Sequence, residues 1–412
     1  MQTEPSPPAR LAPPRRFVSV DALRGFDMLW IVGAGGLVGA LDKMAGKQGS
    51  GLLHFLAQQL SHKEWEGFAF EDLIFPLFVF LVGVSIVFSL TKTLAGGEGK
   101  TTAYKRIGRR FLLMYAVALV YSGGVSKEWP DIRLMGVLNR IALCYLFTSL
   151  AFLHLKTRGL VALVTVLLGG YWALLAAVPF PDLRTRDPKG VLLSEQITAK
   201  SVTELNWGTQ HTIKGVYQPG LNLTHYLDQK YLPGKKWNGT WDPEGFLSTL
   251  PAIATCLLGV FAGLLIQNQS ISDQKKVQYL LMAGVGALAW GFLWGAYFPI
   301  VKKIWSSSFV LVAGGYSALL LGAFYQIIEV WGYQRWAQPF VWVGSNAITI
   351  YLANNLIHFR EVSLRFTGGD VMNFLNEKVH SGVGDLLAAL VTVGIGLALV
   401  RFLYQRKIFL RL

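Results

Sequence analysis

The chain has 412 residues, of which 52% are hydrophobic and only 15% are charged, and its formal net charge is +14. Ordinary soluble domains carry roughly 25% charged residues, so this composition excludes a water-soluble protein. The apolar residues come in blocks of about 20, the length at which a helix spans a bilayer. The excess of Lys and Arg over Asp and Glu is what a membrane protein with basic cytoplasmic loops would show. We therefore expect no nucleic-acid partner.

The apolar blocks predict an all-α polytopic membrane protein, in which about ten transmembrane helices form a bundle with one long extracytoplasmic loop. The expected spans are 17–40, 68–91, 109–123, 137–154, 158–179, 245–267, 277–298, 306–329, 337–358 and 382–403. The expected domains are a disordered cytoplasmic arm (1–16), a five-helix bundle (17–179), an extracytoplasmic loop or cap (180–244), a second five-helix bundle (245–403) and a cytoplasmic tail (404–412). The distribution of Lys and Arg predicts that both termini face the cytoplasm.

Ionisable residues inside the spans are informative, because each costs about 2.5 to 3.5 kcal/mol on insertion scales. Asp21, Arg24 and Asp27 are spaced three residues apart and share one face of the first helix. Arg24 can therefore reach either carboxylate. This spacing predicts an ion pair that holds the first helix against its neighbours, with contact to a cytoplasmic ligand as the alternative. The same charges exclude a cleaved signal peptide.

His62 and Asp72 flank the start of the second span, where the topology predicts the outer surface. On one straight helix, ten positions correspond to about 15 Å of rise, so their side chains could not touch. A bend at Gly67 would bring them together. A His oriented by a carboxylate can act as a general base or a nucleophile. The alternative for a His beside the membrane is a structural role at the interface.

Other polar residues are expected at the same outer level. Arg140 begins the fourth span beside Asn139, and it could pair with Asp72 or bind a hydroxylated ligand. Asp242 or Ser248 could cap the sixth helix. Acids, Arg, Ser and Trp at one level are typical of a sugar vestibule, and a transporter site would have the same composition.

Six motifs follow one another along the chain: Arg16–Gly25, His62-x-x-Trp65-x-Gly67 with Asp72–Phe78, Gly136–Ile141, Asp242–Ala252, Ile304–Leu311 and Gly344–Ile348. Together they resemble the heparan-α-glucosaminide N-acetyltransferase family of transmembrane acyltransferases. The resemblance implies transfer of an acetyl group from cytosolic acetyl-CoA to the amino group of glucosamine, or of a glucosamine-terminated sugar, across the membrane. It places the catalytic pair at His62 and Asp72.

The predicted topology, taken together with this resemblance, suggests candidates for the substrate contacts. Sugar contacts are expected from Trp65, Asn139, Arg140, Glu244 and Ser307. Coenzyme A contacts are expected from Lys105, Arg106, Arg109 and Arg110 at the inner mouth, with Arg24 and Asn346 along the passage. The bias toward basic inner loops explains the first four of these residues equally well.

Several alternatives stay open at this point. His62 could deprotonate the sugar amine, or it could be acetylated first and pass the group on. A transporter of N-acetylglucosamine or a related amino sugar is the main rival to an enzyme. We expect no metal site, the bilayer and the two substrates as partners, and a homodimer from the family alone. The short N-terminal arm favours a bacterial inner-membrane protein.

Overall fold

The computed structural model describes residues 17–46, 51–96, 99–187 and 189–409, so the predicted arm 1–16 and the end of the tail lie outside the described residues. The described chain is mainly helical, with one two-stranded antiparallel sheet, and this confirms the all-α class. The helices are α1 (Val18–Ala45), α2 (Leu52–Gln59), α3 (Phe70–Ala95), α4 (Gly99–Tyr121), α5 (Val137–His154), α6 (Thr157–Ala177), α7 (Leu223–Tyr231), α8 (Thr249–Gln267), α9 (Asp273–Gly295), α10 (Ser307–Tyr325), α11 (Gln338–Ser345), α12 (Ala347–Ile357), α13 (Phe359–Thr367), α14 (Asp370–Phe374) and α15 (Val383–Gln405). The strands are β1 (Phe180–Pro181) and β2 (Thr212–Ile213).

Within the described residues, seven helices are long and apolar enough to cross a membrane, and an eighth span is possible if the two bent parts of α1 count as one. They are α3, α5, α6, α8, α9, α10 with its extension to Val330, and α15. All eight coincide with spans expected from the sequence. The protein is therefore an integral membrane protein.

The other two expected spans have a different structure. Residues 109–123 fall in α4, a continuous helix whose first half carries a series of basic residues. Residues 337–358 do not form one helix, because the chain leaves helical geometry at Asn346 and divides into α11 and α12. A composition window cannot detect such a break, since the apolar residues continue on both sides of Asn346.

Helices from the two predicted five-helix halves pack directly against each other, α3 against α8 and α1 against α11 and α15. The contacts depend on glycine. A Cβ atom at Gly83 would lie 1.9 Å from the carbonyl oxygen of Cys256, and one at Gly344 would lie 1.9 Å from that of Asp21. Only glycine permits such a close approach of two helix backbones, which is common in membranes. The predicted domain boundaries stay a prediction, and the packing crosses them.

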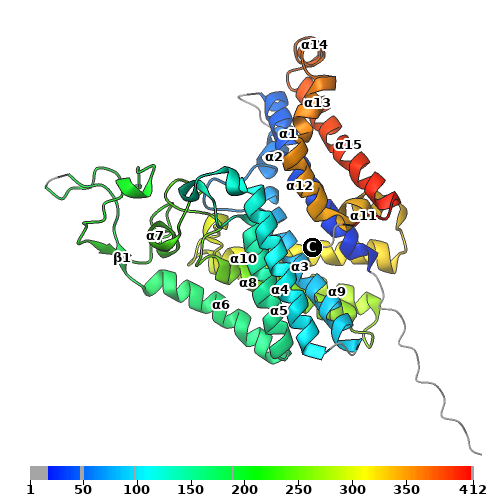
Figure 1. Cartoon of the computed structure of the whole chain (residues 1–412), viewed down its shortest axis with the longest axis horizontal. Coiled ribbons are helices and arrows are strands. Elements are labelled where there is room, and N and C mark those ends of the chain that lie inside the picture. Colours follow the sequence, from blue (N-terminus) through cyan, green and yellow to red (C-terminus); the bar gives the residue numbers. More distant parts are fainter. Residues whose placement is uncertain (1–16, 47–50, 97–98, 188, 410–412) are drawn as a thin grey trace, which may run out of the picture.

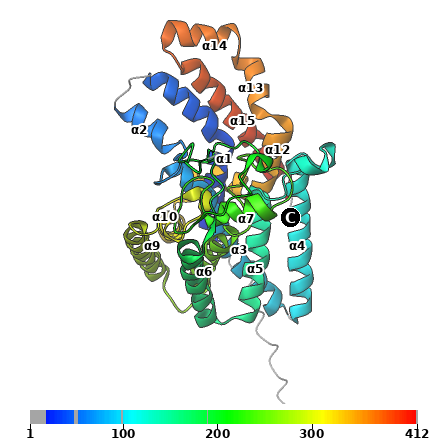
Figure 2. The same cartoon turned by 90° about the vertical axis from the view of Figure 1, so that its left-hand side faces the viewer.

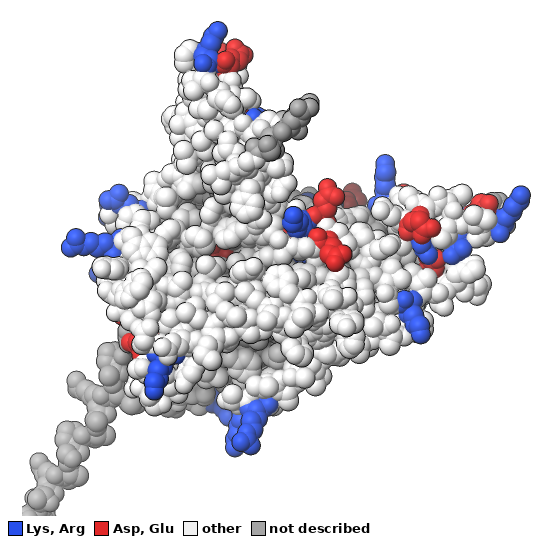
Figure 3. All heavy atoms as spheres, turned by 180° about the vertical axis from the view of Figure 1, so that it is seen from behind, with Lys and Arg blue, Asp and Glu red and all other residues white. Residues whose placement is uncertain are grey.

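The helices form a body and a projecting lobe (Figure 1). The body holds α3 to α6 and α8 to α10, and the lobe holds α12 to α15 together with much of α1. The loop 180–244, which contains α7, extends from the side of the body (Figures 1 and 2). On the face shown in Figure 3, charged side chains lie at the edges of the molecule and in one group at the corner where the projecting helices meet the body, and the broad surface below that corner shows few charges. Such a surface is suited to contact with lipid chains.

Candidate active site

Residues 61–69 form the loop between α2 and α3, and contacts on two sides fix its path. The backbone N–H of Gly67 donates to the carbonyl oxygen of Ile300 at 2.9 Å, and Gly67 has a φ of +115°, which favours glycine. The indole N–H of Trp65 donates to the carbonyl oxygen of Tyr217 at 2.9 Å. The bend expected at Gly67 is therefore present, and it carries the loop back over the start of α3.

His62 and Asp72 meet because of this bend. Nδ1 of His62 lies 3.1 Å from Oδ1 of Asp72. The other carboxylate oxygen accepts the backbone N–H groups of Lys63 and Ala69, each at 3.2 Å. The side chain of Asp72 is 1% exposed, whereas that of His62 is 57% exposed. A fixed, buried carboxylate thus orients an imidazole whose other nitrogen is free to face solvent or a substrate.

Lys302 completes the cluster, although its place there was not predicted from the sequence. It comes from the short segment Lys302–Ile304 between α9 and α10. Its Nζ lies 3.1 Å from Nδ1 of His62 and 3.4 Å from Oδ1 of Asp72. Burial lowers the pKa of Lys302, and the nearby charge of Asp72 opposes that shift. The pair Lys302-Lys303 lies directly before the Ile304–Leu311 motif, and this position could have indicated a basic residue at the site.

These contacts decide which tautomer of His62 can act as a base. If Nδ1 carries the proton, it donates to Asp72, Lys302 pairs with Asp72, and Nε2 keeps its lone pair. If Lys302 instead donates to a bare Nδ1, the proton lies on Nε2, which can then only donate. The buried, acceptor-only carboxylate of Asp72 favours the first arrangement.

The three side chains line a cavity of about 500 Å³. Its polar lining also includes Lys63, Glu71, Arg133, Asn238, Glu244 and Lys303, together with the indole of Trp237. Its apolar lining comes from α1, α3, α5 and α12 and includes Met28, Ile31, Phe75, Phe78, Leu138, Ile141 and Ile348. A concave, largely apolar pocket with a few polar groups and an oriented His is what a small-molecule site requires.

A second set of charged residues adjoins the same cavity, and two of them, Arg133 and Glu244, line it. Arg133 donates to both oxygens of Asp242, at 2.8 and 2.7 Å, and to Glu244 at 2.6 Å. Burial raises the pKa of Glu244. This bidentate geometry holds all three side chains in place. The sequence analysis named Glu244 but not Arg133, which lies far from it in the chain.

Other residues expected at the sugar site lie in packed positions. Ser307 is buried and donates to the carbonyl oxygen of Leu168 at 2.8 Å, which links α10 to α6. Arg140 is fully buried, donates to the side chain of Ser248 and lies 5.0 Å from the ring centroid of Trp305. The pair of Arg140 with Asp72 expected from the sequence is replaced by these contacts, because His62 and Lys302 bind Asp72.

Asn139 and Trp65 are likewise absent from the residues that line the cavity in the described structure. Asn139 is 1% exposed on α5. The ring of Trp65 packs edge-on against His225 and Trp241 of the loop 180–244, with centroids 5.8 and 6.0 Å away. Trp65 therefore anchors the loop of His62 to the cap.

The basic residues expected at the inner mouth lie at the opposite end of α3 from Asp72. Arg106 of α4 donates to the side chain of Thr93, which is 21 residues along α3 from Asp72. At 1.5 Å per residue this is about 31 Å, the thickness of the hydrocarbon core. Arg110 lies over the ring of Tyr145 at 4.7 Å, and Lys105 and Arg109 are exposed.

Polar side chains lie between these two ends. Arg24 donates to Ser85 at 2.6 Å and pairs with Asp21 at 3.4 Å, so the expected ion pair of the first helix is present. Asp27 and Asn346 are buried, and no hydrogen bond reaches their side-chain polar atoms in the described part of the chain. Buried polar groups without partners are rare, and in membrane proteins they often mark a route for a ligand or proton.

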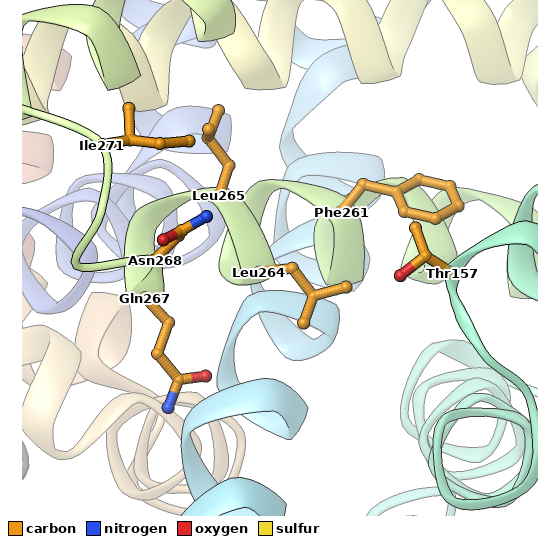
Figure 4. A pocket seen from close by; sticks show the side chains of 7 residues that line it. All are labelled: Thr157, Phe261, Leu264, Leu265, Gln267, Asn268 and Ile271. Carbon is orange, nitrogen blue, oxygen red and sulfur yellow. The ribbon is translucent and has the colours of Figure 1, made fainter.

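A second cavity, of about 530 Å³, lies where the end of α8 approaches the start of α6 (Figure 4). Its lining is Thr157, Phe261, Leu264, Leu265, Gln267, Asn268 and Ile271. None of these residues titrates near neutral pH, so this cavity offers no acid, base or nucleophile of the kind found beside His62.

Comparison with known proteins agrees with the motifs. Residues 16–185 match the family model described as heparan-alpha-glucosaminide N-acetyltransferase, catalytic, and this stretch contains both His62 and Asp72. The chain is 24% identical over 385 residues to heparan-alpha-glucosaminide N-acetyltransferase of Homo sapiens, and 25% identical over 397 residues to that of Mus musculus. Residues 16–185 thus match this family's catalytic model, and most of the chain is similar to its two mammalian members.

The two alignments cover 83% and 84% of this chain but only 53% and 56% of the relatives. The chain thus spans about half the length of the curated relatives that it matches.

Proposed function

We propose that this protein is a membrane-embedded N-acetyltransferase. It moves an acetyl group from acetyl-CoA to the amino group of glucosamine, or of a sugar that ends in glucosamine, with the two substrates on opposite sides of the membrane. The observation that carries the proposal is the contact of exposed His62 with buried Asp72 at the rim of a cavity, within the stretch that matches the family.

The separation of two charge clusters supports transfer across the membrane. His62, Asp72 and Lys302 lie at one end of α3, and the basic residues of α4 lie near the other end. Guanidinium and ammonium groups are suited to the phosphates of coenzyme A. In this proposal Lys105, Arg106, Arg109 and Arg110 hold the nucleotide end, and Arg24 and Asn346 line the passage for the thioester arm. Both termini then lie on the side of acetyl-CoA.

In the direct route, Nε2 of His62 removes a proton from the sugar ammonium, and the free amine attacks the thioester carbonyl. The tetrahedral intermediate collapses with loss of the thiolate of coenzyme A. The imidazolium of His62 gives the proton that it took from the ammonium to the thiolate, which leaves as the thiol. His62 then takes the second proton from the acylated nitrogen and releases it to solvent. Asp72 holds the tautomer and stabilises the imidazolium while it exists.

In the covalent route, Nε2 attacks the thioester first and releases coenzyme A, and the sugar amine then removes the acetyl group from His62. Incubation with acetyl-CoA and no sugar distinguishes the routes. Release of coenzyme A in an amount equal to the enzyme supports the covalent route, and no release supports direct transfer.

The first test uses purified protein in detergent, where no sealed compartment exists. Labelled acetyl-CoA and glucosamine should give labelled N-acetylglucosamine, and His62→Gln should lower kcat by about 10² to 10⁴, the usual contribution of a general base. His54→Gln is the matched control, because His54 is an exposed residue of the neighbouring α2. Full activity of His62→Gln would show that His62 is neither the general base nor the nucleophile.

The same assay separates the enzyme from its rival, an amino-sugar transporter. A transporter would move sugar into sealed vesicles without consuming acetyl-CoA and would form no labelled product in detergent. A homodimer and a bacterial inner membrane are further parts of the proposal, to be tested by the mass of the purified particle and by fractionation of the source cells.

A further inference from the structure

Trp237 presents its indole ring to the cavity that contains His62. Its side chain is 69% exposed, although it lies between a buried lysine and a tight turn in the loop 232–242. The guanidinium carbon of Arg133 lies 5.0 Å from the ring centroid. A cation on a ring face is attracted to the π electrons, so this contact fixes the orientation of the indole.

The backbone that carries this ring is fixed by its own loop. The backbone N–H of Trp237 donates to Oδ2 of Asp242 at 3.0 Å, and that of Asn238 donates to the carbonyl oxygen of Trp241 at 3.1 Å. Gly239 has a φ of +76° and closes the turn. Asp242 is itself fixed by Arg133. The backbone of Trp237 is therefore fixed at the cavity, and the contact with Arg133 orients its ring.

Two hydrogen-bonding side chains line the same cavity beside this ring. The amide of Asn238 can donate and accept, and the carboxylate of Glu244 can accept. A pyranose offers the matching surface, with a face of C–H groups and a rim of hydroxyls. The negative face of an indole attracts C–H hydrogens, and an amide and a carboxylate bind hydroxyl groups.

We propose that Trp237, Asn238 and Glu244 form the acceptor subsite of this protein, and that the subsite selects a closed pyranose ring. The ring stacks on Trp237, its hydroxyls bind Asn238 and Glu244, and its amino group points to His62 across the shared cavity. This inference rests on the proposed acetyltransferase function, and it adds that the protein recognises the ring rather than the amine.

Binding in the absence of acetyl-CoA tests the subsite without turnover. In saturation-transfer NMR with protein in detergent, glucosamine and glucose should both receive magnetisation, strongest on the C–H protons of one face. Glucosaminitol, the open-chain alcohol of glucosamine, should receive little. Trp237→Ala should greatly reduce the transfer at the same sugar concentration. Trp207→Ala is the control, because Trp207 is a 42% exposed residue of the same loop region outside the residues that line the cavity.

In the acetyl-transfer assay, Trp237→Ala should raise KM for glucosamine about tenfold, the loss expected for one stacked ring. Values of kcat and of KM for acetyl-CoA should change by less than about twofold, since stacking contributes equally to substrate and transition-state binding. Trp237→Phe should recover most of the affinity, and this variant also serves if Trp237→Ala does not fold.

Two results would overturn the inference: unchanged sugar affinity in the folded Trp237 variants, or equal binding of glucosaminitol and glucosamine to the wild-type protein. Sugar binding without acetyl transfer would overturn the proposed enzyme and leave the subsite intact. The two failures are therefore distinguishable.

Discussion

At the scale of single residues, the cluster of His62, Asp72 and Lys302 determines the chemistry. The carboxylate of Asp72 is 1% exposed and sits between an imidazole and an ammonium group. A buried carboxylate with two partners is held in one place, and it transmits that position to His62. We infer that Lys302 is a positioning residue, because it neutralises Asp72 and so sets how strongly that carboxylate holds the imidazole.

Lys302→Met should lower kcat by about 10-fold to 100-fold with little change in either KM, because it perturbs the base and leaves binding intact. The pH profile distinguishes this role from a purely structural one. Burial lowers the pKa of Lys302, so its charge is present at low pH and is lost on the alkaline side at a lower pH than in a free lysine. Wild-type activity should therefore decline at alkaline pH, and the variant should lack that decline.

Lys303→Met is the matched control for this prediction, since Lys303 is the next residue and lines the same cavity. It should keep the alkaline decline. If activity of Lys302→Met still declines at alkaline pH as in the wild type, Lys302 does not position Asp72 and His62.

At the scale of elements, helix packing and the cap position the cluster. The α3–α8 contact fixes the start of α3, where Asp72 lies, and it is close enough that a Cβ atom at Gly259 would lie 1.8 Å from the carbonyl oxygen of Phe80. Gly259→Leu should therefore destabilise the folded protein by more than about 3 kcal/mol, because a backbone contact cannot yield as a side chain does.

Thermal unfolding in detergent measures this effect. Gly286→Leu is the control, because Gly286 lies on α9 with open space around it. Equal melting temperatures for the two variants would contradict the proposed close approach of α3 and α8.

The cap contains two buried titratable residues on α7 whose effects on stability oppose each other. Burial lowers the pKa of His225 to about 3, and its ring stacks on Trp241 with centroids 3.8 Å apart. Burial raises the pKa of Asp228 to about 7. The stability due to neutral His225 is present above its unfolded pKa and is lost as the pH falls toward about 3. That due to neutral Asp228 is present at low pH and is lost as the pH rises toward about 7.

Asp228→Asn should remove one of the two opposing dependences of stability on pH and leave the one due to His225. Between about pH 6.5 and pH 4.5, the cap of this variant should lose stability on acidification more steeply than the wild type. Hydrogen exchange of the α7 amides, compared with wild type at each pH, measures the difference. Glu195→Gln is the control, because Glu195 is 84% exposed on the same loop. A variant that follows the wild type at both pH values would contradict the buried, protonated state of Asp228.

At the scale of the whole molecule, the features that depend on local sequence, such as apolar spans and short motifs, could be predicted. Eight of the expected spans follow from apolar blocks, and the meeting of His62 with Asp72 follows from their motif and the bend at Gly67. The break at Asn346 was missed, because hydropathy averages over it.

The residues that join the site only through contacts between distant parts of the chain could not be predicted. Lys302 reaches His62 from 240 positions away, and Arg133 reaches Asp242 from 109 positions away. No single-sequence pattern encodes such pairs. Trp65 and Ser307 belong to recognisable motifs, but their side chains stabilise the packing around the cavity. A motif therefore indicated which segments converge without distinguishing residues that line the cavity from those that support it.

Vesicles with one substrate on each side test whether the acetyl group crosses the membrane. Protein of known orientation is reconstituted with labelled acetyl-CoA on the side of the α4 basic residues and glucosamine on the side of His62. Labelled N-acetylglucosamine should accumulate only in the glucosamine compartment, and His62→Gln should abolish it. Product that forms only when both substrates share one compartment would contradict transfer across the membrane.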